Sequence, residues 1–450
     1  MRYGRSKACK CLFSFSGLLV VLLLFFGLAP STPQVHRFKL PTVDANSVLV
    51  YSVYFDNRSS MTTEIRALAF KNCSRSAPLT AAVRWTNSEV TTHSVQFEPD
   101  LITCPWSYNL GCHWGSFFLK IPAALNLSVC VQPLFFYTDF KELVQFIEIW
   151  HSLGANLIYF YVVSVTDFID SIIDFYVQQG IARKISWPAL PKSATLNPNR
   201  YVYRYGHTLA WNDCLLRNSG LAKYVALVDL DEFIIPTYGL DLVSLLDTKF
   251  AELPYAGAYR FRHRRVLMPV NLAERGLFSY LNHLRQDVHP FKVGLQGKMI
   301  VKPETVDIMQ VHWVHRFKPK SANPQWAFYD LSPDLAMLYH LRRVAYPRVY
   351  EEKLWNPVHE TEPSFELAQF HDLVEKKFEL ELKPWLGSVD KMFEQMIEPK
   401  LIENCTELWR SHWFEVCKSP ETLCESTIAR ETAQKGINWI KSNSRLVSII

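Results

Sequence analysis

Residues 221–236 read LAKYVALVDLDEFIIP, and this stretch decides the fold expected for the chain. Its residues 224–228 form a continuous apolar run with β-branched side chains, which predicts a strand buried on both faces of a parallel sheet. Three acids follow at once. In extended chain Asp229 and Asp231 project to one side and Glu232 to the other, so two carboxylates can share one hard divalent cation. Such a cation can hold a diphosphate as a leaving group; the simpler alternative is a strand that ends in a solvated acidic turn.

The chain before this stretch alternates between predicted strands and helices. Apolar runs at 129–136 and 157–163 predict buried strands, and each precedes apolar residues at helical spacing that end at a glycine. Asp139, with Glu142 three residues later, has the capping-box pattern of a helix start. A third helix at 205–217 leads into the acidic strand. The alternation predicts a parallel sheet with right-handed crossovers and with the acids at its carboxyl end, where open α/β folds bind ligands.

Composition and missing signatures exclude several classes of protein. The 450 residues, 49% of them hydrophobic, suffice for a large core in two or three domains. The net charge of +5 is small and the basic residues are dispersed, so no nucleic-acid partner is indicated. The motifs G-x-G-x-x-G after the first strand, G-x-x-x-x-G-K-[ST], H-E-x-x-H and G-x-S-x-G are all absent. The usual signatures of Rossmann dehydrogenases, P-loop NTPases, zincins and α/β-hydrolases are therefore missing.

The N-terminus indicates the compartment. Residues 1–11 contain four basic side chains, and residues 12–29 are small or apolar without a charge. A helix of that length spans ~27 Å, enough for a thin bilayer. The positive-inside rule then predicts a cytosolic tail at 1–11, a transmembrane signal-anchor at 12–29 and a lumenal remainder, as in a single-pass type II membrane protein. A cleaved signal peptide is the alternative.

Sequons and cysteines agree with a lumenal chain. Acceptor sequons for N-glycans begin at Asn57, Asn72, Asn126 and Asn404. Eight cysteines beyond the predicted span suit disulfides in an oxidising lumen: Cys73, Cys104, Cys112, Cys130, Cys214, Cys405, Cys417 and Cys424. Bridges are expected mostly within the N-terminal and C-terminal clusters, and one pair crosses between regions unless Cys214 stays free in its helix. Zinc is disfavoured because no pair has the C-x2–4-C spacing.

The remaining segments complete the predicted domain plan. Residues 30–45 predict a stem, and residues 46–125, with short alternating runs, predict a small β-rich module. Residues 126–348 contain the strand and helix alternation. Residues 349–450 predict a helical C-terminal extension that contains disulfides.

A set of motifs in the α/β region resembles one family. In chain order they are VCVQPLFFYTD at 129–139, FIEIW at 146–150, WNDCLLR at 211–217, VDLDEF at 228–233, GKMIVKP at 297–303 and VHW at 311–313. Over residues 128–345 their order and spacing resemble the glycosyltransferase family 92 proteins. The resemblance implies a GT-A fold for residues 126–348, a Rossmann-like and mostly parallel sheet with flanking helices. It also implies an inverting, manganese-dependent Golgi enzyme that uses UDP-galactose and forms β-1,4 linkages on galactose or fucose of glycoprotein N-glycans, or on plant galactan.

The resemblance also implies roles for individual residues. Asp231 matches the direct manganese ligand, and Asp229 matches the residue that contacts the ribose, or the metal through water. His340 lies where many GT-A enzymes add a late histidine to the metal, and imidazole suits manganese. The alternative for His340 is a histidine satisfied within the core.

An inverting transfer needs one general base that takes the proton from the acceptor hydroxyl. Asp307, His312 and Glu232 are the candidates, and Glu232 has the alternative role of bracing the metal ligands.

Three further side chains and one basic run are candidates for donor binding. Lys298 and the basic run at 260–265 are placed to face the diphosphate, although a solvent-facing strand also explains the run. Asn212 and Asp213 either reach the donor base or tie their helix to a neighbouring loop.

The sequence therefore predicts a Golgi type II galactosyltransferase. Two alternatives come from other classes: a lumenal glycan-binding protein of the same fold, disfavoured by the intact acidic motif, and a tethered adhesion protein, disfavoured by the strand and helix alternation. A transferase with another UDP-sugar donor stays open, and the oligomeric state is not specified.

Overall fold

The structure is a computed structural model. It describes residues 48–56, 64–70, 79–82, 92–95, 125–190, 199, 202–237, 239, 241–268, 276–292, 297–319, 325–343, 360–397, 401, 420–442 and 447–449. The predicted tail, span and stem lie outside these residues. Within them, no helix is both long and apolar enough to cross a membrane.

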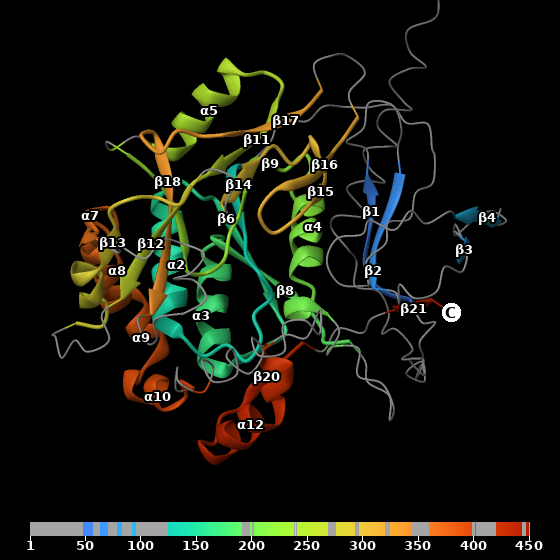
Figure 1. Cartoon of the computed structure of the whole chain (residues 1–450). Coiled ribbons are helices and arrows are strands. Elements are labelled where there is room, and N and C mark those ends of the chain that lie inside the picture. The colour runs from blue at the N-terminus through green and yellow to red at the C-terminus, as the bar shows by residue number, and fades with distance from the viewer. Residues whose placement is uncertain are drawn as a thin grey trace, which may run out of the picture. The chain divides into compact units, whose positions relative to one another are not determined.

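A seven-stranded sheet forms the centre of the α/β region (Figure 1). Its strands in spatial order are β17 (Ala327–Asp330), β11 (Ala256–Phe261), β14 (Lys298–Val301), β9 (Ala222–Leu227), β5 (Leu125–Cys130), β6 (Leu157–Val162) and β8 (Ala182–Ser186). β5 pairs in parallel with β6 and β9, β6 pairs in parallel with β8, and β11 pairs in parallel with β17. Only β14 runs antiparallel to its neighbours β9 and β11. The largely parallel sheet predicted from the sequence is therefore present.

Helices cover both faces of this sheet because its strands are apolar on both sides. On β9, Tyr224 and Ala226 belong to one buried cluster, and Val225 and Leu227 belong to the other. The first cluster also contains α2 (Phe140–Ser152), α3 (Asp167–Gln178) and α5 (Leu242–Glu252), whereas α4 (His207–Arg217) packs in the second. Successive residues of β9 are thus buried on opposite faces of the sheet, as expected for parallel strands that are covered on both sides.

The predicted strand at 129–136 has the wrong bounds. β5 ends at Cys130, and the chain continues as an irregular segment that keeps one parallel bridge to the sheet, from Leu134 to Val162 of β6. In this segment Phe136 has a φ of +47°. A non-glycine residue in that region of φ does not continue a strand. The irregular segment then leads to the start of α2.

A second sheet of five strands stands beside the acidic turn. Its order is β10 (Glu232–Pro236), β18 (Ala336–Arg343), β12 (His263–Met268), β13 (Arg285–Asp287) and β19 (Thr361–Pro363). β10 and β18 are antiparallel, with Glu232 opposite His340. This register brings a residue of the C-terminal half of the chain next to the acids.

The disulfide in the described part joins the sheet to a helix. Cys130, at the end of β5, is bonded to Cys214 of α4. Cys214 is therefore the partner that crosses between regions, and the alternative of a free thiol there is wrong. The side chains of the other cysteines beyond the predicted span lie outside the described residues.

The N-terminal strands are β1 (Val48–Asp56), β2 (Glu64–Phe70), β3 (Leu79–Ala82) and β4 (Thr92–Val95), which form two antiparallel pairs. The C-terminal β21 (Val447–Ile449) adds to β1.

The remaining elements lie mainly in the C-terminal third of the chain. A hairpin is formed by β15 (Val306–Met309) and β16 (Val314–Phe317), and β20 (Trp439–Lys441) pairs with β7 (Ser164–Thr166). The helical elements are 3-10 turns at Tyr203–Tyr205 and Ser279–His283, α7 (Phe365–Ala368), α8 (His371–Lys377), a π-helical turn at Phe378–Leu382, α9 (Lys383–Leu386), α10 (Val389–Glu394) and α12 (Pro420–Gln434).

Candidate active site

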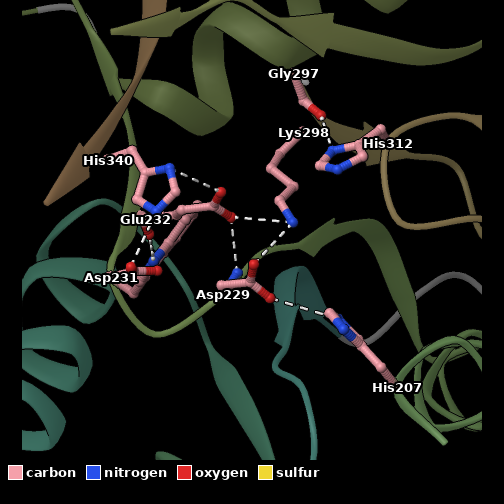
Figure 2. A network of polar contacts seen from close by, with 9 residues as sticks. His207, Asp229, Asp231, Glu232, Gly297, Lys298, His312 and His340 are labelled. Atoms are coloured by element: carbon pink, nitrogen blue, oxygen red, sulfur yellow. Dashed lines mark hydrogen bonds and ion pairs between the residues drawn. The ribbon is translucent and has the colours of Figure 1, made fainter. Parts of the chain in front are cut away.

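The acidic residues lie in a tight turn between β9 and β10. The backbone N–H of Asp229 donates to Oε2 of Glu232 at 2.8 Å, and the N–H of Glu232 donates to the carbonyl of Asp229 at 3.1 Å. Leu341 of β18 donates its N–H to the carbonyl of Asp231 at 2.8 Å. The chain is therefore turned rather than extended here. The expectation that both aspartates project to one side is wrong: Figure 2 shows Asp229 directed toward Lys298 and His207, and Asp231 directed toward His340.

Asp229 is held by a buried ammonium group. Nζ of Lys298 lies 3.1 Å from Oδ2 of Asp229 and 3.4 Å from Oε2 of Glu232, and only 1% of the lysine side chain is exposed. Burial opposes ionisation of Asp229, but the nearby charge of Lys298 holds the pKa of this carboxyl below its usual range. The pKa of Glu232 is raised, mainly by burial. Lys298 therefore contacts the acids directly instead of projecting freely into a diphosphate site.

Asp231 and His340 form the second contact of the turn. Nε2 of His340 lies 2.9 Å from Oδ2 of Asp231, and Nδ1 lies 3.6 Å from Oε1 of Glu232. The ring of His263 packs on His340 with centroids 4.7 Å apart, and burial lowers the pKa of His263 well below its ordinary value. The nearby His340, followed by Arg342, lowers the pKa of Asp231 against the opposing effect of burial.

A strained turn brings His207 to the other oxygen of Asp229. Arg204, Tyr205 and Gly206 have φ values of +45°, +53° and +86°, and α4 begins immediately afterwards. Nε2 of His207 then lies 3.4 Å from Oδ1 of Asp229. Burial lowers the pKa of His207 to about 3, so the imidazole is neutral at physiological pH. Backbone strain of this kind persists only where the surrounding structure enforces it, and it is common at functional sites.

His312 reaches the same site from the turn between β15 and β16. Its Nδ1 lies 3.1 Å from the carbonyl oxygen of Gly297, which can only accept, so Nδ1 carries the proton and Nε2 carries a lone pair. Burial lowers the pKa of His312 to about 4. Gly297 is needed here, because a Cβ at this position would lie 2.5 Å from the carbonyl oxygen of Phe261.

Glu142 is a site residue that the sequence pattern missed. Only half of the predicted capping box forms: Asp139 accepts from the N–H of Glu142 at 3.0 Å, but the Glu142 carboxylate accepts from the hydroxyl of Tyr137 at 2.8 Å. Burial, followed by the negative charge of Asp231, raises the pKa of Glu142 to about 7. Tyr137, five positions before Glu142, is the sequence signal that could have indicated this second use of the carboxylate.

Three other predicted residues have mainly structural contacts. Asn212 ties α4 to β15, since its side chain donates to the carbonyl of Met309 at 2.9 Å and accepts from the N–H of Met309 at 2.9 Å. Asp213 is fully buried and accepts from Tyr161 and Arg217. Asp307 pairs with Arg316 and lies 3.8 Å from Lys318. The basic run at 260–265 likewise pairs with acids of neighbouring strands, such as Asp330 and Asp287.

The donor atoms of the site fit a divalent cation in kind but are not arranged as a finished metal centre. Within the described part of the chain, no three His, Cys, Asp or Glu side chains are grouped so as to hold a metal ion. Asp231 and His340 nevertheless supply the oxygen and nitrogen donors that manganese accepts. Oδ1 of Asp229 is buried and takes part in no hydrogen bond. The turn therefore offers one carboxylate and one imidazole side by side, with a further carboxylate oxygen nearby.

Comparison with known proteins agrees with these observations. The family model of glycosyltransferase family 92 matches residues 126–383. Two glycosyltransferase family 92 proteins of Caenorhabditis elegans are 24% and 28% identical over 220 and 241 residues, which is 48% and 51% of this chain and 42% and 44% of theirs. Beta-1,4-galactosyltransferase galt-1 of the same organism is 25% identical over 194 residues, 42% of this chain and 43% of that protein.

The matched region is thus less than half the length of each of these relatives. A solved structure, HddC from Yersinia pseudotuberculosis, overlaps 49% of this chain and 90% of that chain at 9% identity, but its TM-score of 0.22 is too low to relate the two folds. The family model covers more than half of the sequence, including the acidic turn, Lys298 and His340. The chain belongs to glycosyltransferase family 92.

Proposed function

We propose that this glycosyltransferase transfers galactose from UDP-galactose to a terminal galactose or fucose of glycoprotein N-glycans, with inversion and with formation of a β-1,4 linkage. The observation that carries the proposal is the acidic turn at the carboxyl edge of the parallel sheet, with Asp231 beside His340. The similarity to galt-1, which is named a beta-1,4-galactosyltransferase, supports the sugar and the linkage. A different UDP-sugar is the alternative donor.

Asp231 and His340 would hold a manganese ion, and Asp229 would contact the ribose of the donor, or the ion through water. When bound, the ion would neutralise charge on the departing diphosphate. The side chains of the protein fix the shape of the turn. Glu232 is 2% exposed and accepts the N–H of Asp229, so it fixes the shape of the turn and is poorly placed to meet a substrate.

The acceptor proton requires a group with a lone pair that faces the site. Of the residues predicted from the sequence, His312 suits this role best, because its Nδ1 is committed to the carbonyl of Gly297 and its Nε2 is left to accept a proton. Glu232 is enclosed, and Asp307 is paired with Arg316 on the β15–β16 hairpin. In the proposed step Nε2 of His312 takes the proton while the acceptor oxygen forms the new bond to the anomeric carbon, and the bond from that carbon to the diphosphate oxygen breaks and releases UDP.

The proposed location is the Golgi membrane, in single-pass type II orientation with the catalytic domain in the lumen. The support comes from the basic residues before the apolar segment at 12–29 and from the sequons beyond it. Asn126, the sequon residue that lies within the described part, is exposed at the start of β5.

Donor turnover by the full-length chain in detergent tests the proposal. A panel of UDP-sugars is offered with N-glycans that end in galactose or carry fucose, with manganese and with EDTA. Release of UDP from UDP-galactose, with a new galactose on one acceptor, is expected only with the metal. Asp231→Asn should abolish it, whereas the matched change Asp390→Asn, at an exposed position of α10, should not. Absence of turnover with every donor from folded protein would refute the proposal.

A further inference from the structure

The ammonium group of Lys298 lies within the acidic turn as a cation that belongs to the protein itself. Three carboxylates, those of Asp229, Asp231 and Glu232, lie within four consecutive residues. The ammonium group of Lys298 contacts two of them, at 3.1 Å from Asp229 and 3.4 Å from Glu232. The third carboxylate contacts His340. The turn therefore has two cation positions, and a side chain of the protein fills one of them.

The pairing of β14 with β9 fixes the position of Lys298 beside the acids. β14 runs antiparallel to β9 with Met299 opposite Leu227, so the preceding residue on β14 lies beside the end of β9, where the acids begin. The Lys298 side chain is 1% exposed, and its Nζ lies 4.8 Å from the centre of the Trp211 ring. Ring and carboxylates together surround the ammonium group, as burial of a charge requires.

The lysine is charged in this position. Burial alone would lower the pKa of Lys298, but Asp229 and then Glu232 raise it above its ordinary value. The ammonium group occupies the place between the two carboxylates, so a second cation at the same place would be repelled by it. At Asp231 the contacting group is the imidazole of His340, which can itself ligate a metal ion, whereas an ammonium group cannot.

We propose that Lys298 is a built-in counter-cation between Asp229 and Glu232, so that the turn binds one divalent cation, through Asp231 and His340, and Asp229 is not a direct ligand. This inference rests on the proposed metal-dependent transfer. Lys298 is then a positioning residue, which keeps the turn in its shape whether or not the metal is bound. The role differs from direct contact with the donor diphosphate.

Binding of Mn²⁺ to the full-length protein in detergent, without donor, tests the proposal. Electron paramagnetic resonance of free Mn²⁺ gives both the number of ions bound and the affinity. The wild type should bind one ion. Asp231→Asn should weaken binding at least tenfold, whereas Asp229→Asn should change the affinity less than threefold. Equal losses in both variants would overturn the proposal, as would two ions in the wild type.

Removal of the lysine charge gives a second, independent readout. Lys298→Met keeps the length of the side chain, and it should lower the melting temperature in EDTA and bind a second Mn²⁺ that restores stability. In the double variant Lys298→Met with Asp229→Asn, the single ion and the wild-type melting temperature should return, since fewer negative charges remain uncompensated. If the double variant is no more stable than Lys298→Met, the counter-cation role is wrong. The double variant and Asp229→Asn keep the test open if Lys298→Met does not fold.

The two proposals fail in distinguishable ways. If the wild type turns over UDP-galactose with manganese while Asp229→Asn loses Mn²⁺ binding as fully as Asp231→Asn, only the counter-cation role is refuted. If the wild type binds no Mn²⁺, both are refuted.

Discussion

Replacement of Glu142 by glutamine should stabilise the protein above neutral pH. The carboxyl is partly buried and senses the charge of Asp231, and its pKa is raised from 4.5 to about 7, chiefly by burial. A raised carboxyl pKa means that the folded state binds the proton more tightly than the unfolded state. The folded state therefore loses stability as pH rises from 4.5 to 7, and the loss is complete above pH 7.

The expected size follows from this pKa difference. One pKa unit corresponds to about 1.4 kcal/mol, so the charged Glu142 destabilises the fold by roughly 3 kcal/mol above pH 7. Glutamine removes this penalty, and its amide oxygen can still accept from the hydroxyl of Tyr137. The gain should nearly vanish at pH 4.5, where the carboxyl is protonated in the folded state and half protonated in the unfolded state.

Thermal unfolding followed by tryptophan fluorescence, in EDTA at pH 4.5 and pH 8, measures the difference. Glu142→Gln should raise the melting temperature by several degrees at pH 8 and scarcely at all at pH 4.5. A shift that is the same at both pH values would refute the reasoning, because it could not come from the charge of the carboxyl.

Glu148 supplies a matched control on the same helix. Its carboxylate accepts from Tyr176 at 2.6 Å, and burial likewise raises its pKa, but Asp231 is not among the charges that act on it. Both glutamine variants should therefore gain stability at pH 8. Only Glu142→Gln should also weaken Mn²⁺ binding and lower turnover, because only its charge acts on Asp231. Equal Mn²⁺ affinity in the two variants would show that Glu142 has no part in the site.

Three further changes have defined outcomes. His312→Gln should lower kcat at least a hundredfold, because it removes the general base. In the wild type, kcat should stay level down to about pH 5 and fall near pH 4, where the imidazole of His312 (pKa about 4) becomes protonated. The pH–rate profiles of both proteins measure these effects. Asn212→Ala should lower the free energy of unfolding by about 2 kcal/mol without changing KM for the donor, since it leaves the two backbone groups of Met309 unpaired. Replacing Cys130 and Cys214 together by alanine should lower the free energy of unfolding by about 4.5 kcal/mol, by the chain-entropy relation for a separation of 84 residues. Thermal unfolding measures this loss, and an unchanged melting temperature would contradict it.

The order of the elements and the identity of the acidic turn could be read from the sequence alone. Apolar periodicity is a local property, and it placed α2, α3 and the strand before Asp229 correctly. Local sequence patterns gave wrong predictions where a segment or side chain makes contacts other than those of the element that its pattern indicates. The segment after β5 has strand-like composition but is irregular, with Phe136 at a positive φ. Glu142 has capping-box spacing, but its carboxylate accepts from Tyr137.

Only the tertiary structure decided which side chains meet at the site. Lys298 reaches Asp229 across 69 residues of sequence, and His340 reaches Asp231 across 109. Both contacts depend on strand order and register, with β14 beside β9 and β18 beside β10. A one-residue slip in either pairing would turn these side chains to the opposite face of the sheet. The sequence by itself determined that the acids follow a buried strand, whereas the pairing of distant strands determined that one acid faces an ammonium group and another an imidazole.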